Sequence, residues 1–311
     1  MPVKHSQKDP REIHECPPLE EPPQPPPGRE TEMRNKPNHG EESYRGAERL
    51  KGKVALIIGG DSGIGKAVAI AFAREGAEVA LSYPPEEESD ARETTEWVKK
   101  AGRKSLQSPG DIRDEAHCRE LIDRVVSEFG HLDVLVNNAA FQASHEKLGE
   151  FDSEEWDRTF RTNIYSMFYL SKAAVPRMRK GGAIINTTSV QAYQPKGQLL
   201  AYATTKGAIV TFTKALSQLV IENGISRECR GSGAGMDPAD SIHYAAGLRQ
   251  EIRREGPHGK AVSTGGIGAQ LCVFGERGVH LYYRLGDGSH RRTHAALGFR
   301  EALLFFQDPA Q

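Results

Sequence analysis

Apolar residues between positions 51 and 225 follow two alternating patterns. Short runs such as VALII at 54–58 and EVALSY at 78–83 have the length and composition of buried strands, whereas 65–77 carries apolar residues at helical spacing. Further helix-like segments lie at 86–101, 114–129, 153–179 and 199–223, and further strand-like segments at 104–108, 133–139 and 183–189. This alternation predicts an α/β fold, in which one doubly wound parallel sheet carries helices on both faces.

Residues 1–50 follow neither pattern. They contain ten of the 18 prolines, including the run PPQPPP at 22–27, and almost no large apolar side chains. Such a composition buries too little surface to offset the entropy that ordering costs, and proline favours extended conformations. We therefore predict a Pro-rich flexible extension. The alternative is a Pro-rich adaptor segment that binds a partner protein through residues 1–40.

Composition narrows the classes of function. The chain has 41 Lys and Arg against 42 Asp and Glu, so no long-range attraction to nucleic acid or to an anionic membrane is expected. The apolar runs are too short for a membrane span, and no signal peptide is expected. Four cysteines stand far apart without a CxxC pair, at positions 16, 118, 229 and 272. This spacing predicts neither disulfides nor a metal site and is typical of a cytoplasmic protein.

The motif GGDSGIG follows the first predicted strand and opens the first predicted helix. Its glycines allow a tight turn, let the backbone approach a pyrophosphate and let the helix pack against the strand, while the helix N-terminus offers N–H groups to the phosphates. A plain strand-to-helix turn is the alternative, but the position within a βαβ unit favours the binding of a dinucleotide's phosphates. The predicted contacts are Gly59, Asp61, Ser62, Gly63, Ile64 and Gly65.

The end of the second strand bears on which dinucleotide is bound. An acidic residue there accepts hydrogen bonds from the ribose hydroxyls of NAD. Ser82 and Tyr83 stand there instead, with no carboxylate until Glu86. Lys66, just past the glycines, offers a cation for a 2′-phosphate. These features favour NADP(H) as the cofactor, with NAD(H) as the alternative, and make Tyr83 a candidate cofactor contact.

A further polar position follows the third predicted strand. Asp111 and Ile112 come directly after this strand, at the end of the sheet where such folds bind ligands. We predict that the two residues frame the adenine ring. The alternative is that Asp111 caps a helix that begins near Arg113.

Four residues in the second half of this segment are suited to proton transfer. Tyr202 and Lys206 stand four residues apart in YATTK, so a helix places both side chains on one face. The ammonium favours the phenolate and is expected to lower the pKa of Tyr202 from about 10. Ser189 ends a predicted strand and is placed to hydrogen-bond the same substrate oxygen, and Asn163 is a candidate to anchor a water that links Lys206 to solvent. A surface Tyr–Lys pair is the alternative.

Together these motifs resemble the short-chain dehydrogenase/reductase family, over about residues 50–225. The stretches that carry the resemblance are LKGKVALIIGGDSGIGKAVAIAFAREGAEVA, LDVLVNNAA, FRTNIYSMFYL, AIINTTSVQAY and ATTKGAIVTFTKALSQ. The finer resemblance is to the branch of glucose/ribitol dehydrogenase-like proteins, aldehyde reductases and general-stress oxidoreductases. The leader of this chain, which ends in HGEESYRGAERLKGK, also resembles the N-terminal extension of that branch. One departure is Ile58, where the family has a threonine whose hydroxyl stabilises the turn.

The resemblance implies an NAD(P)(H)-dependent oxidoreductase that transfers a hydride between the nicotinamide and a carbonyl or alcohol carbon of a small aldehyde, sugar or polyol. By resemblance, Ser189, Tyr202 and Lys206 form the catalytic triad, with Tyr202 as general acid/base and Asn163 as a fourth member. The implied cofactor contacts beyond the glycine motif are Asn138, Ala139, Ala140, Tyr202 and Lys206. The resemblance also implies a homodimer or homotetramer built on the last two predicted helices.

The resemblance ends near residue 225. Residues 226–311 contain ten Arg and one Lys, whereas the residues before them contain fifteen of each. The tail also holds 14 of the 32 glycines. The family has a strand, a Pro-Gly loop over the nicotinamide, a lid helix and a closing strand in this region, and SRECRGSGAGMDP at 226–238 matches none of them.

Back-translation explains this break. Read one base later with permitted codons, 226–245 becomes RVNAVAPGPVWTPLIPSTMP, the missing strand and Pro-Gly loop, and Met236 followed by Asp237 dictates its tryptophan codon. The same offset yields YVFLAS near 271–276 and YITG near 281–284. We therefore infer that the tail is a frameshifted continuation of a reductase gene, through sequencing error or mutation. The alternative is a divergent C-terminal segment.

Three segments result: the extension at 1–50, a catalytic domain at 51–225, and an atypical, poorly ordered tail at 226–311. The single Rossmann-type sheet is then incomplete at its C-terminal edge, which exposes a strand edge and leaves the nicotinamide half of the site uncovered. We expect the chain with this tail to be poorly soluble and nearly inactive. The alternative function is accordingly a non-catalytic member of the family that binds a nucleotide weakly at most.

Overall fold

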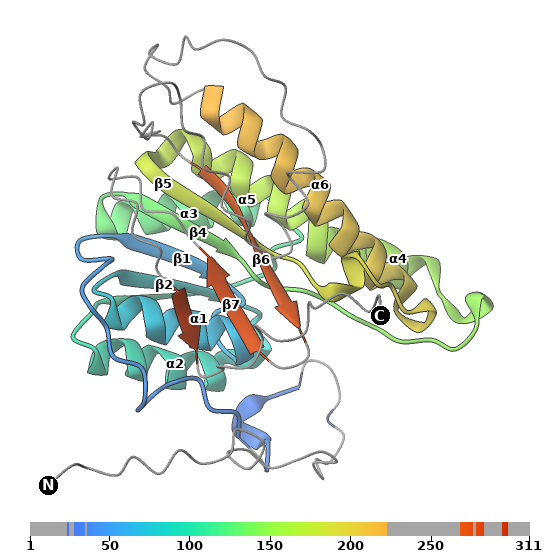
Figure 1. Cartoon of the computed structure of the whole chain (residues 1–311), viewed down its shortest axis with the longest axis horizontal. Helices are drawn as coiled ribbons and strands as arrows, with labels where there is room; N and C mark the ends of the chain where they lie inside the picture. Colours follow the sequence, from blue (N-terminus) through green and yellow to red (C-terminus); the bar gives the residue numbers. More distant parts are fainter. Residues whose placement is uncertain are drawn as a thin grey trace, which may run out of the picture.

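The computed structural model describes residue 24, residues 28–34 and 36–222, and three strands between 268 and 297. The strands are β1 (Val54–Ile58), β2 (Glu78–Tyr83), β3 (Ser105–Pro109), β4 (Leu132–Asn137), β5 (Met178–Thr187), β6 (Gly268–Gly275), β7 (Gly278–Tyr282) and β8 (His294–Leu297). They form one sheet in the order β3-β2-β1-β4-β5-β6-β7-β8, parallel from β3 to β6 (Figure 1). The predicted α/β fold with a parallel sheet is confirmed.

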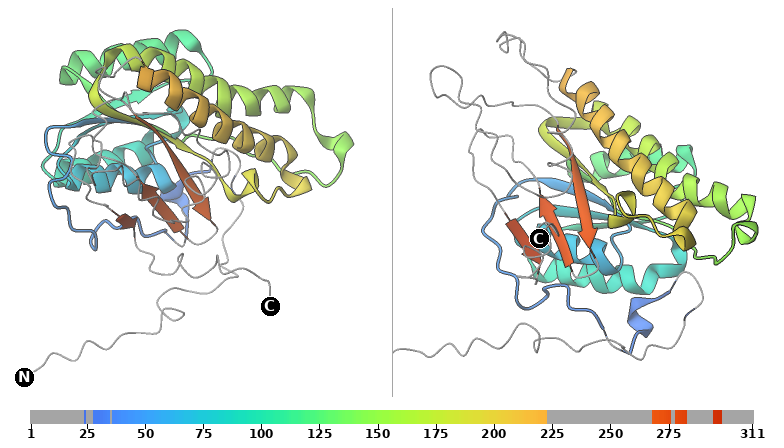
Figure 2. Two further views of the ribbon diagram at one scale, coloured as in Figure 1. Left: turned by 45° about the horizontal axis from the view of Figure 1, so that its top comes forward. Right: turned by 45° about the vertical axis from the view of Figure 1, so that its right-hand side comes forward.

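Helices cover both faces of this sheet (Figure 2). They are α1 (Gly63–Arg74) and α2 (Glu88–Lys100) on one face, and α3 (Glu115–Phe129), α5 (Ser166–Ala174) and α6 (Leu200–Glu222) on the other, with α4 (Ser153–Phe160) preceding α5. Strands β2 and β3 lie on one side of β1, whereas β4 and β5 lie on its other side, so the strand order reverses between β1 and β4. Folds of this kind bind their ligands in the crevice that such a reversal opens at the carboxyl ends of the strands.

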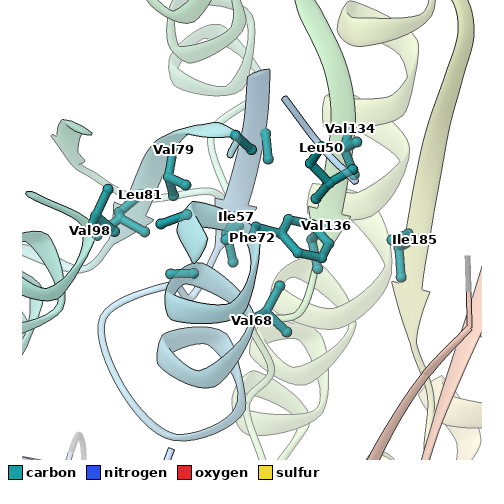
Figure 3. Close-up of a cluster of buried hydrophobic side chains, with 14 of the residues drawn as sticks. Leu50, Ile57, Val68, Phe72, Val79, Leu81, Val98, Val134, Val136 and Ile185 are labelled. Atoms are coloured by element: carbon teal, nitrogen blue, oxygen red, sulfur yellow. The ribbon is translucent and has the colours of Figure 1, made fainter. Parts of the chain in front are cut away.

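Strand β1 shows how the sequence builds a core on each side of the sheet. All five of its residues are buried, as expected for a central parallel strand. Because successive side chains point to opposite faces, Ala55 and Ile57 join a cluster with Phe72 of α1 (Figure 3). Leu56 joins a second cluster with Leu121 of α3. Short apolar runs of this kind therefore hold both helical layers.

The stretch 153–179, predicted as one amphipathic helix, is divided in the structure. A π-helical turn at Arg161–Tyr165 separates α4 from α5. After α5 comes a single 3-10 turn at Val175–Arg177, because Pro176 has no N–H group with which to continue the helix. Strand β5 then begins at Met178, earlier than the apolar pattern predicted.

At its C-terminal edge the sheet continues further than predicted. Strand β6 pairs in parallel with β5, with Ala183 opposite Gly268 and Thr187 opposite Cys272. Strands β7 and β8 extend the sheet in antiparallel pairing. The edge of β5 that was expected to be exposed is therefore paired. The remainder of 226–311, including the segment that stands in place of the Pro-Gly loop, lies outside the described residues.

The N-terminal leader also differs from its prediction. Residues 28–34 and 36–50 lie against α1 and α2, and Leu50 is completely buried in the core. Charged side chains together with Leu50 attach this part, whereas the proline content predicted a flexible extension. Most of the proline run at 22–27 lies outside the described residues.

Candidate active site

The glycine turn between β1 and α1 is shaped for the close approach of a ligand. Gly59 and Gly63 have φ angles of +70° and +50°, in the left-handed region that glycine adopts freely. A Cβ atom on Gly65 would lie 1.7 Å from the carbonyl oxygen of Gly59, so only glycine lets α1 begin this close to β1. Ser62 is the N-cap residue of α1, and Ile64 packs against the core. The N-terminus of α1 thus lies at the carboxyl end of β1.

The loop after β4 lies against this turn. Asn138 donates from Nδ2 to the carbonyl oxygen of Gly59 at 3.2 Å and accepts at Oδ1 from the hydroxyl of Thr187 at 3.3 Å. Ala139 lies so close that a Cβ on Gly59 would meet its Cα at 3.0 Å. Ala140, the next residue, is exposed. Asn138 and Ala139, two of the implied cofactor contacts, therefore border the glycine turn, and Asn138 also contacts the end of β5.

Two hydrogen-bonded pairs lie near the end of β2, namely Tyr83 with Glu88 and the acidic pair Asp61–Glu87. Tyr83 is buried and donates its hydroxyl to Glu88 at 2.6 Å, and its burial and this carboxylate raise its pKa. Asp61 of the glycine turn is hydrogen-bonded to Glu87, which follows β2. Burial raises the pKa of both carboxyls, and the contact with Asp61 helps to raise that of Glu87 to about 8. Glu87 is therefore largely protonated at neutral pH and donates a hydrogen bond to Asp61.

Lys66 already has ionic partners. Its side chain is 3% exposed, and its Nζ lies 2.8 Å from Glu30 Oε1 and 3.2 Å from Glu93 Oε1. A cation compensated by two carboxylates does not offer a free charge to a phosphate. The sequence-based argument that Lys66 favours NADP(H) is therefore wrong for this structure.

Asp111 and Ile112 follow β3, as predicted. Asp111 is exposed and binds Arg113, whose Nη2 lies 2.6 Å from Oδ2, and this hydrogen bond lowers the pKa of the carboxyl. Helix α3 is capped instead by Asp114, which accepts from the amide of Ala116 at 2.9 Å. The alternative role of Asp111 as a helix cap is therefore wrong. The contact of Asp111 and half-buried Ile112 with adenine stays a prediction.

The structure brings Ser189, Tyr202 and Lys206 together at the carboxyl end of β5. Ser189 caps a short 3-10 turn after β5 and is hydrogen-bonded to the phenol of Tyr202. Lys206 lies one turn after Tyr202 on α6, with its Nζ 5.2 Å from the centre of the phenol ring. The same Nζ donates to the carbonyl oxygen of Thr187 at 3.0 Å. Since Thr187 also binds Asn138, this cluster is connected to the glycine turn.

Burial sets the protonation of the two titratable groups in this cluster. Lys206 is 2% exposed, and burial lowers its pKa to about 8. Burial raises the pKa of Tyr202, and the hydrogen bond from Ser189 only partly opposes this. The expected lowering by Lys206 is not found, because the ammonium donates to a backbone carbonyl rather than to the phenol. Near neutral pH, Tyr202 is thus a neutral proton donor beside a cation that titrates only slightly higher.

Asn163 lies in the π-helical turn between α4 and α5, a distortion that is frequent at functional sites. Its Oδ1 accepts from the amide of Phe141 at 2.7 Å, and its Nδ2 donates to the Phe141 carbonyl and to the hydroxyl of Thr205, both at 3.0 Å. Thr205 in turn donates to the carbonyl of Tyr202 at 2.7 Å. Asn163 therefore joins the loop after β4 to α6. Its role in anchoring a water stays a prediction.

Sequence reasoning missed the residues that support this site. Thr187 carried a signal, since it lies in AIINTTS two positions before Ser189. Thr205 carried a weaker one, as a neighbour of Lys206 in YATTK. Glu30 carried none, because a carboxylate within a proline-rich leader has no spacing that relates it to the glycine turn.

Comparison with known proteins identifies the family. The model of the short chain dehydrogenase family matches residues 53–233, which include the glycine turn and all three residues of the cluster on β5 and α6. The chain belongs to the short-chain dehydrogenase family. General stress protein 39 of Bacillus subtilis (strain 168) is 48% identical over 199 residues, covering 64% of this chain and 69% of that protein. The NADPH-dependent aldehyde reductase 1, chloroplastic, of Arabidopsis thaliana is 45% identical over 204 residues, covering 64% and 71%.

A solved structure supports the same assignment. A short chain dehydrogenase from Burkholderia cenocepacia J2315, in complex with NADP, superposes with a TM-score of 0.53 at 33% identity, covering 55% of this chain and 70% of that one. As a short-chain dehydrogenase, this chain is a member of an oxidoreductase family, and its resemblance to the branch with aldehyde reductases and general-stress proteins is confirmed. Within the described residues, the helices are too short or too polar to cross a membrane.

Proposed function

We propose that this chain is an NAD(P)(H)-dependent oxidoreductase that interconverts a carbonyl and an alcohol on a small aldehyde, sugar or polyol. One observation carries the proposal: Ser189, Tyr202 and buried Lys206 converge at the end of β5, joined through Thr187 and Asn138 to the glycine turn. A proton donor and a cation are thereby held next to a fold element that is suited to phosphates. The name of the Arabidopsis relative, an aldehyde reductase, supports the substrate class.

The residues present fit a nicotinamide dinucleotide. Gly65 lets α1 begin against β1, so the amides of its first turn that Glu30 does not occupy would bind the pyrophosphate. Asn138 and Ala139 would border the path toward Tyr202 and Lys206, which would contact the nicotinamide ribose. When bound, the nicotinamide would supply or accept the hydride.

The chain's own residues would handle the substrate oxygen and its proton. Ser189 would hydrogen-bond the carbonyl oxygen and hold it beside the phenol of Tyr202. Tyr202 would donate its proton to this oxygen as the alcohol forms. The Lys206 ammonium, whose Nζ lies 5.2 Å from the centre of the Tyr202 ring, would donate to the nicotinamide ribose beside it. Asn163 would hold α6 in place through Thr205.

Cofactor preference rests on the acidic pair at the end of β2. The absence of a carboxylate at Ser82 and Tyr83 argued for NADP(H), but Asp61 and Glu87 supply one there. Because the carboxylate of Asp61 repels a 2′-phosphate and a carboxylate at this end of the sheet accepts hydrogen bonds from ribose hydroxyls, we place NAD(H) ahead of NADP(H). Because the pKa of Glu87 is about 8, the negative charge lies on Asp61, so Asp61→Asn is expected to lower the ratio of kcat/KM for NADH over NADPH. An unchanged ratio in this variant would contradict the assignment.

Self-association is the second part of the proposal. The π-helical turn, α5 and α6 expose large apolar side chains, Tyr165 at 41%, Phe168 at 48% and Leu219 at 61%. Exposed apolar side chains on neighbouring helices favour a contact between copies, which would give a homodimer or homotetramer. Phe168→Asp is expected to lower the molar mass measured by light scattering. A wild-type chain that elutes as a monomer would refute this part.

The activity is tested by following the oxidation of NADH and NADPH by absorbance with a panel of small aldehydes and sugars. The chain with its present tail and a frame-restored chain are both assayed, each with Tyr202→Phe as the matched control. Activity that Tyr202→Phe abolishes supports the proposal, because this variant keeps the ring and removes only the proton donor. Activity that is absent from both chains, or equal in the phenylalanine variants, refutes it.

A further inference from the structure

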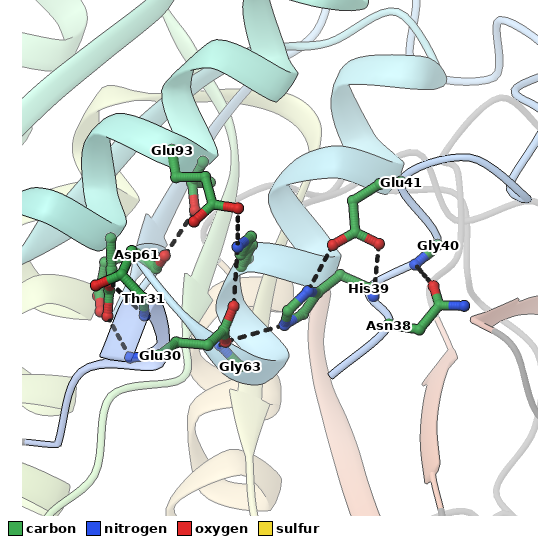
Figure 4. A network of polar contacts seen from close by, with 12 residues as sticks. Glu30, Thr31, Asn38, His39, Gly40, Glu41, Asp61, Gly63 and Glu93 are labelled. Atoms are coloured by element: carbon green, nitrogen blue, oxygen red, sulfur yellow. Dashed lines mark hydrogen bonds and ion pairs between the residues drawn. The ribbon is translucent and has the colours of Figure 1, made fainter. Parts of the chain in front are cut away.

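The leader is attached near both ends of α1, and Figure 4 shows its contacts near the first turn of this helix. We call residues 28–34 and 36–50 the strap. Near the first turn of α1, the strap forms a 3-10 turn at Glu30–Glu32. Just beyond the last turn, Glu75 accepts from the amides of Ala47 and Arg49, each at 3.0 Å. The strap therefore spans the helix whose N-terminus belongs to the glycine turn.

Glu30 bonds directly to the glycine turn. Its Oε2 accepts from the amide of Gly63 at 2.7 Å, and its Oε1 accepts from Nζ of Lys66 at 2.8 Å. The backbone amides of Glu30 and Thr31 donate to Asp90 of α2 at 2.8 and 3.1 Å. One short turn of the strap thus joins the first turn of α1 to the first turn of α2.

A buried histidine holds Glu30 from the opposite side. Nε2 of His39 lies 3.0 Å from Oε2 of Glu30, and its Nδ1 lies 2.8 Å from Oε1 of Glu41. Glu30, His39 and Lys66 are 8%, 4% and 2% exposed. Withdrawing Glu30 would leave the Lys66 ammonium buried with only Glu93 as a partner, which is strongly unfavourable. Detaching the strap from α1 is therefore energetically unfavourable, and the strap is a stable part of the fold.

The hydrogen bond to Glu30 restrains the backbone at Gly63. This glycine has a positive φ, and a Cβ placed on it would meet nothing within 4 Å, so packing does not restrain it. Ser62, the N-cap residue of α1, makes no capping hydrogen bond with its side chain. The carboxylate of Glu30 replaces that cap from 33 residues away, and Lys66 compensates its charge beside the anion-binding end of α1.

We propose that the strap builds the phosphate end of the dinucleotide site and that Glu30 is its positioning residue. The carboxylate holds the Gly63 amide and keeps the first turn of α1 ordered before the dinucleotide arrives. This proposal rests on the proposed function for its ligand, but not for its structural part. It assigns the leader to cofactor binding rather than to the binding of a partner protein.

The test compares Glu30→Gln with Glu32→Gln in the full chain. Glu32 lies in the same 3-10 turn, is exposed and pairs only with Arg29 among the described residues, so it is the matched control. Hydrogen exchange of the amides at 60–68 is measured without ligand, and the Kd for NADH by titration of protein fluorescence. Glu30→Gln is expected to speed exchange at 60–68 and to raise Kd on the order of tenfold, as loss of a charge-assisted hydrogen bond does. Glu32→Gln is expected to match the wild type in both measurements.

Glu30→Asp keeps the proposal testable if Glu30→Gln fails to fold. The shorter carboxylate keeps its charge beside Lys66 and His39 but does not reach Gly63 as well, so intermediate exchange and Kd are expected. Unchanged exchange at 60–68 in both Glu30 variants, or effects of equal size in Glu32→Gln, would overturn the proposal. A wild-type chain that binds neither NADH nor NADPH would refute the proposed function, while the exchange measurement would still decide the role of the strap.

Discussion

Replacing Gly65 with alanine tests the glycine turn most directly. The added Cβ would lie 1.7 Å from the carbonyl oxygen of Gly59 and 2.9 Å from the Cα of Gly60. Both atoms belong to the backbone, so no side chain can swing aside to make room. The first turn of α1 must therefore move away from the end of β1.

The size of that movement sets the expected effect. Because non-bonded heavy atoms rarely approach within about 3 Å, the two atoms must separate by roughly 1.3 Å or more. Overpacking of this kind typically destabilises a folded chain by about 1–3 kcal/mol, which lowers Tm by roughly 2–4 °C per kcal/mol in a domain of this size. A displacement of about 1 Å in a binding element costs on the order of a hundredfold in function. We therefore expect Kd for NADH to rise about a hundredfold while the fold survives.

The assay pairs fluorescence titration with NADH and thermal unfolding. Gly149→Ala is the control, because a Cβ there would meet nothing within 4 Å and the residue lies in an exposed turn. The control should bind NADH like the wild type and unfold at the same temperature. Wild-type affinity in Gly65→Ala would refute the assignment of this turn to the phosphates, and loss of affinity together with complete unfolding would call for the milder comparison with Gly60→Ala.

Three further predictions concern titration and the tail. Carbonyl reduction should slow as pH rises through about 8, because burial lowers the pKa of Lys206 to that value and the neutral amine is a weaker hydrogen-bond donor to the nicotinamide ribose; a profile that is flat from about pH 7 to 9 would contradict this. Burial lowers the pKa of His39, but its hydrogen bonds to Glu30 and Glu41 outweigh burial and raise it above 6.5, so its contribution to the free energy of unfolding is fully present below pH 6.5 and is lost as pH rises through the higher native value. Urea unfolding across this range should show that loss in the wild type and not in His39→Gln. A chain whose frame is restored after residue 225 should oxidise NADH with aldehydes, whereas the chain with the present tail should be nearly inactive; equal rates would refute the expected inactivity of the chain with this tail.

Local pattern predicted much of the fold. Strand β2 has the bounds of EVALSY, and the alternating strands and helices gave the parallel sheet, because apolar periodicity reports directly on which faces are buried. The pattern was less informative at 153–179, where a π-helical turn and Pro176 divide an otherwise continuous amphipathic stretch. It also did not predict that β6 would pair with β5, since strand partners far apart in sequence leave no local trace.

The contacts of the candidate site likewise fall into those that local spacing predicted and those that join elements far apart in sequence. Tyr202 and Lys206 meet because a helix brings residues four positions apart onto one face, which the spacing alone predicts. The pairs Asp61–Glu87 and Glu30–Gly63 join separate elements and became visible only when the elements were placed. The predicted effect of Lys206 on the pKa of Tyr202 was wrong for the same reason, because the ammonium donates a hydrogen bond to the carbonyl oxygen of Thr187 on another element.

Apart from 153–179, the amino-acid sequence by itself determined the types and order of the elements between 51 and 222, the glycine turn, and the residues available for proton transfer. These depend on backbone geometry over a few residues, and a short stretch of chain carries that information in full. Tertiary structure alone decided that the strap lies along α1, that Lys66 is compensated by Glu30 and Glu93, and that Lys206 titrates near 8. Burial and charge pairing sum over neighbours from many parts of the chain, so they exist only once those parts have come together.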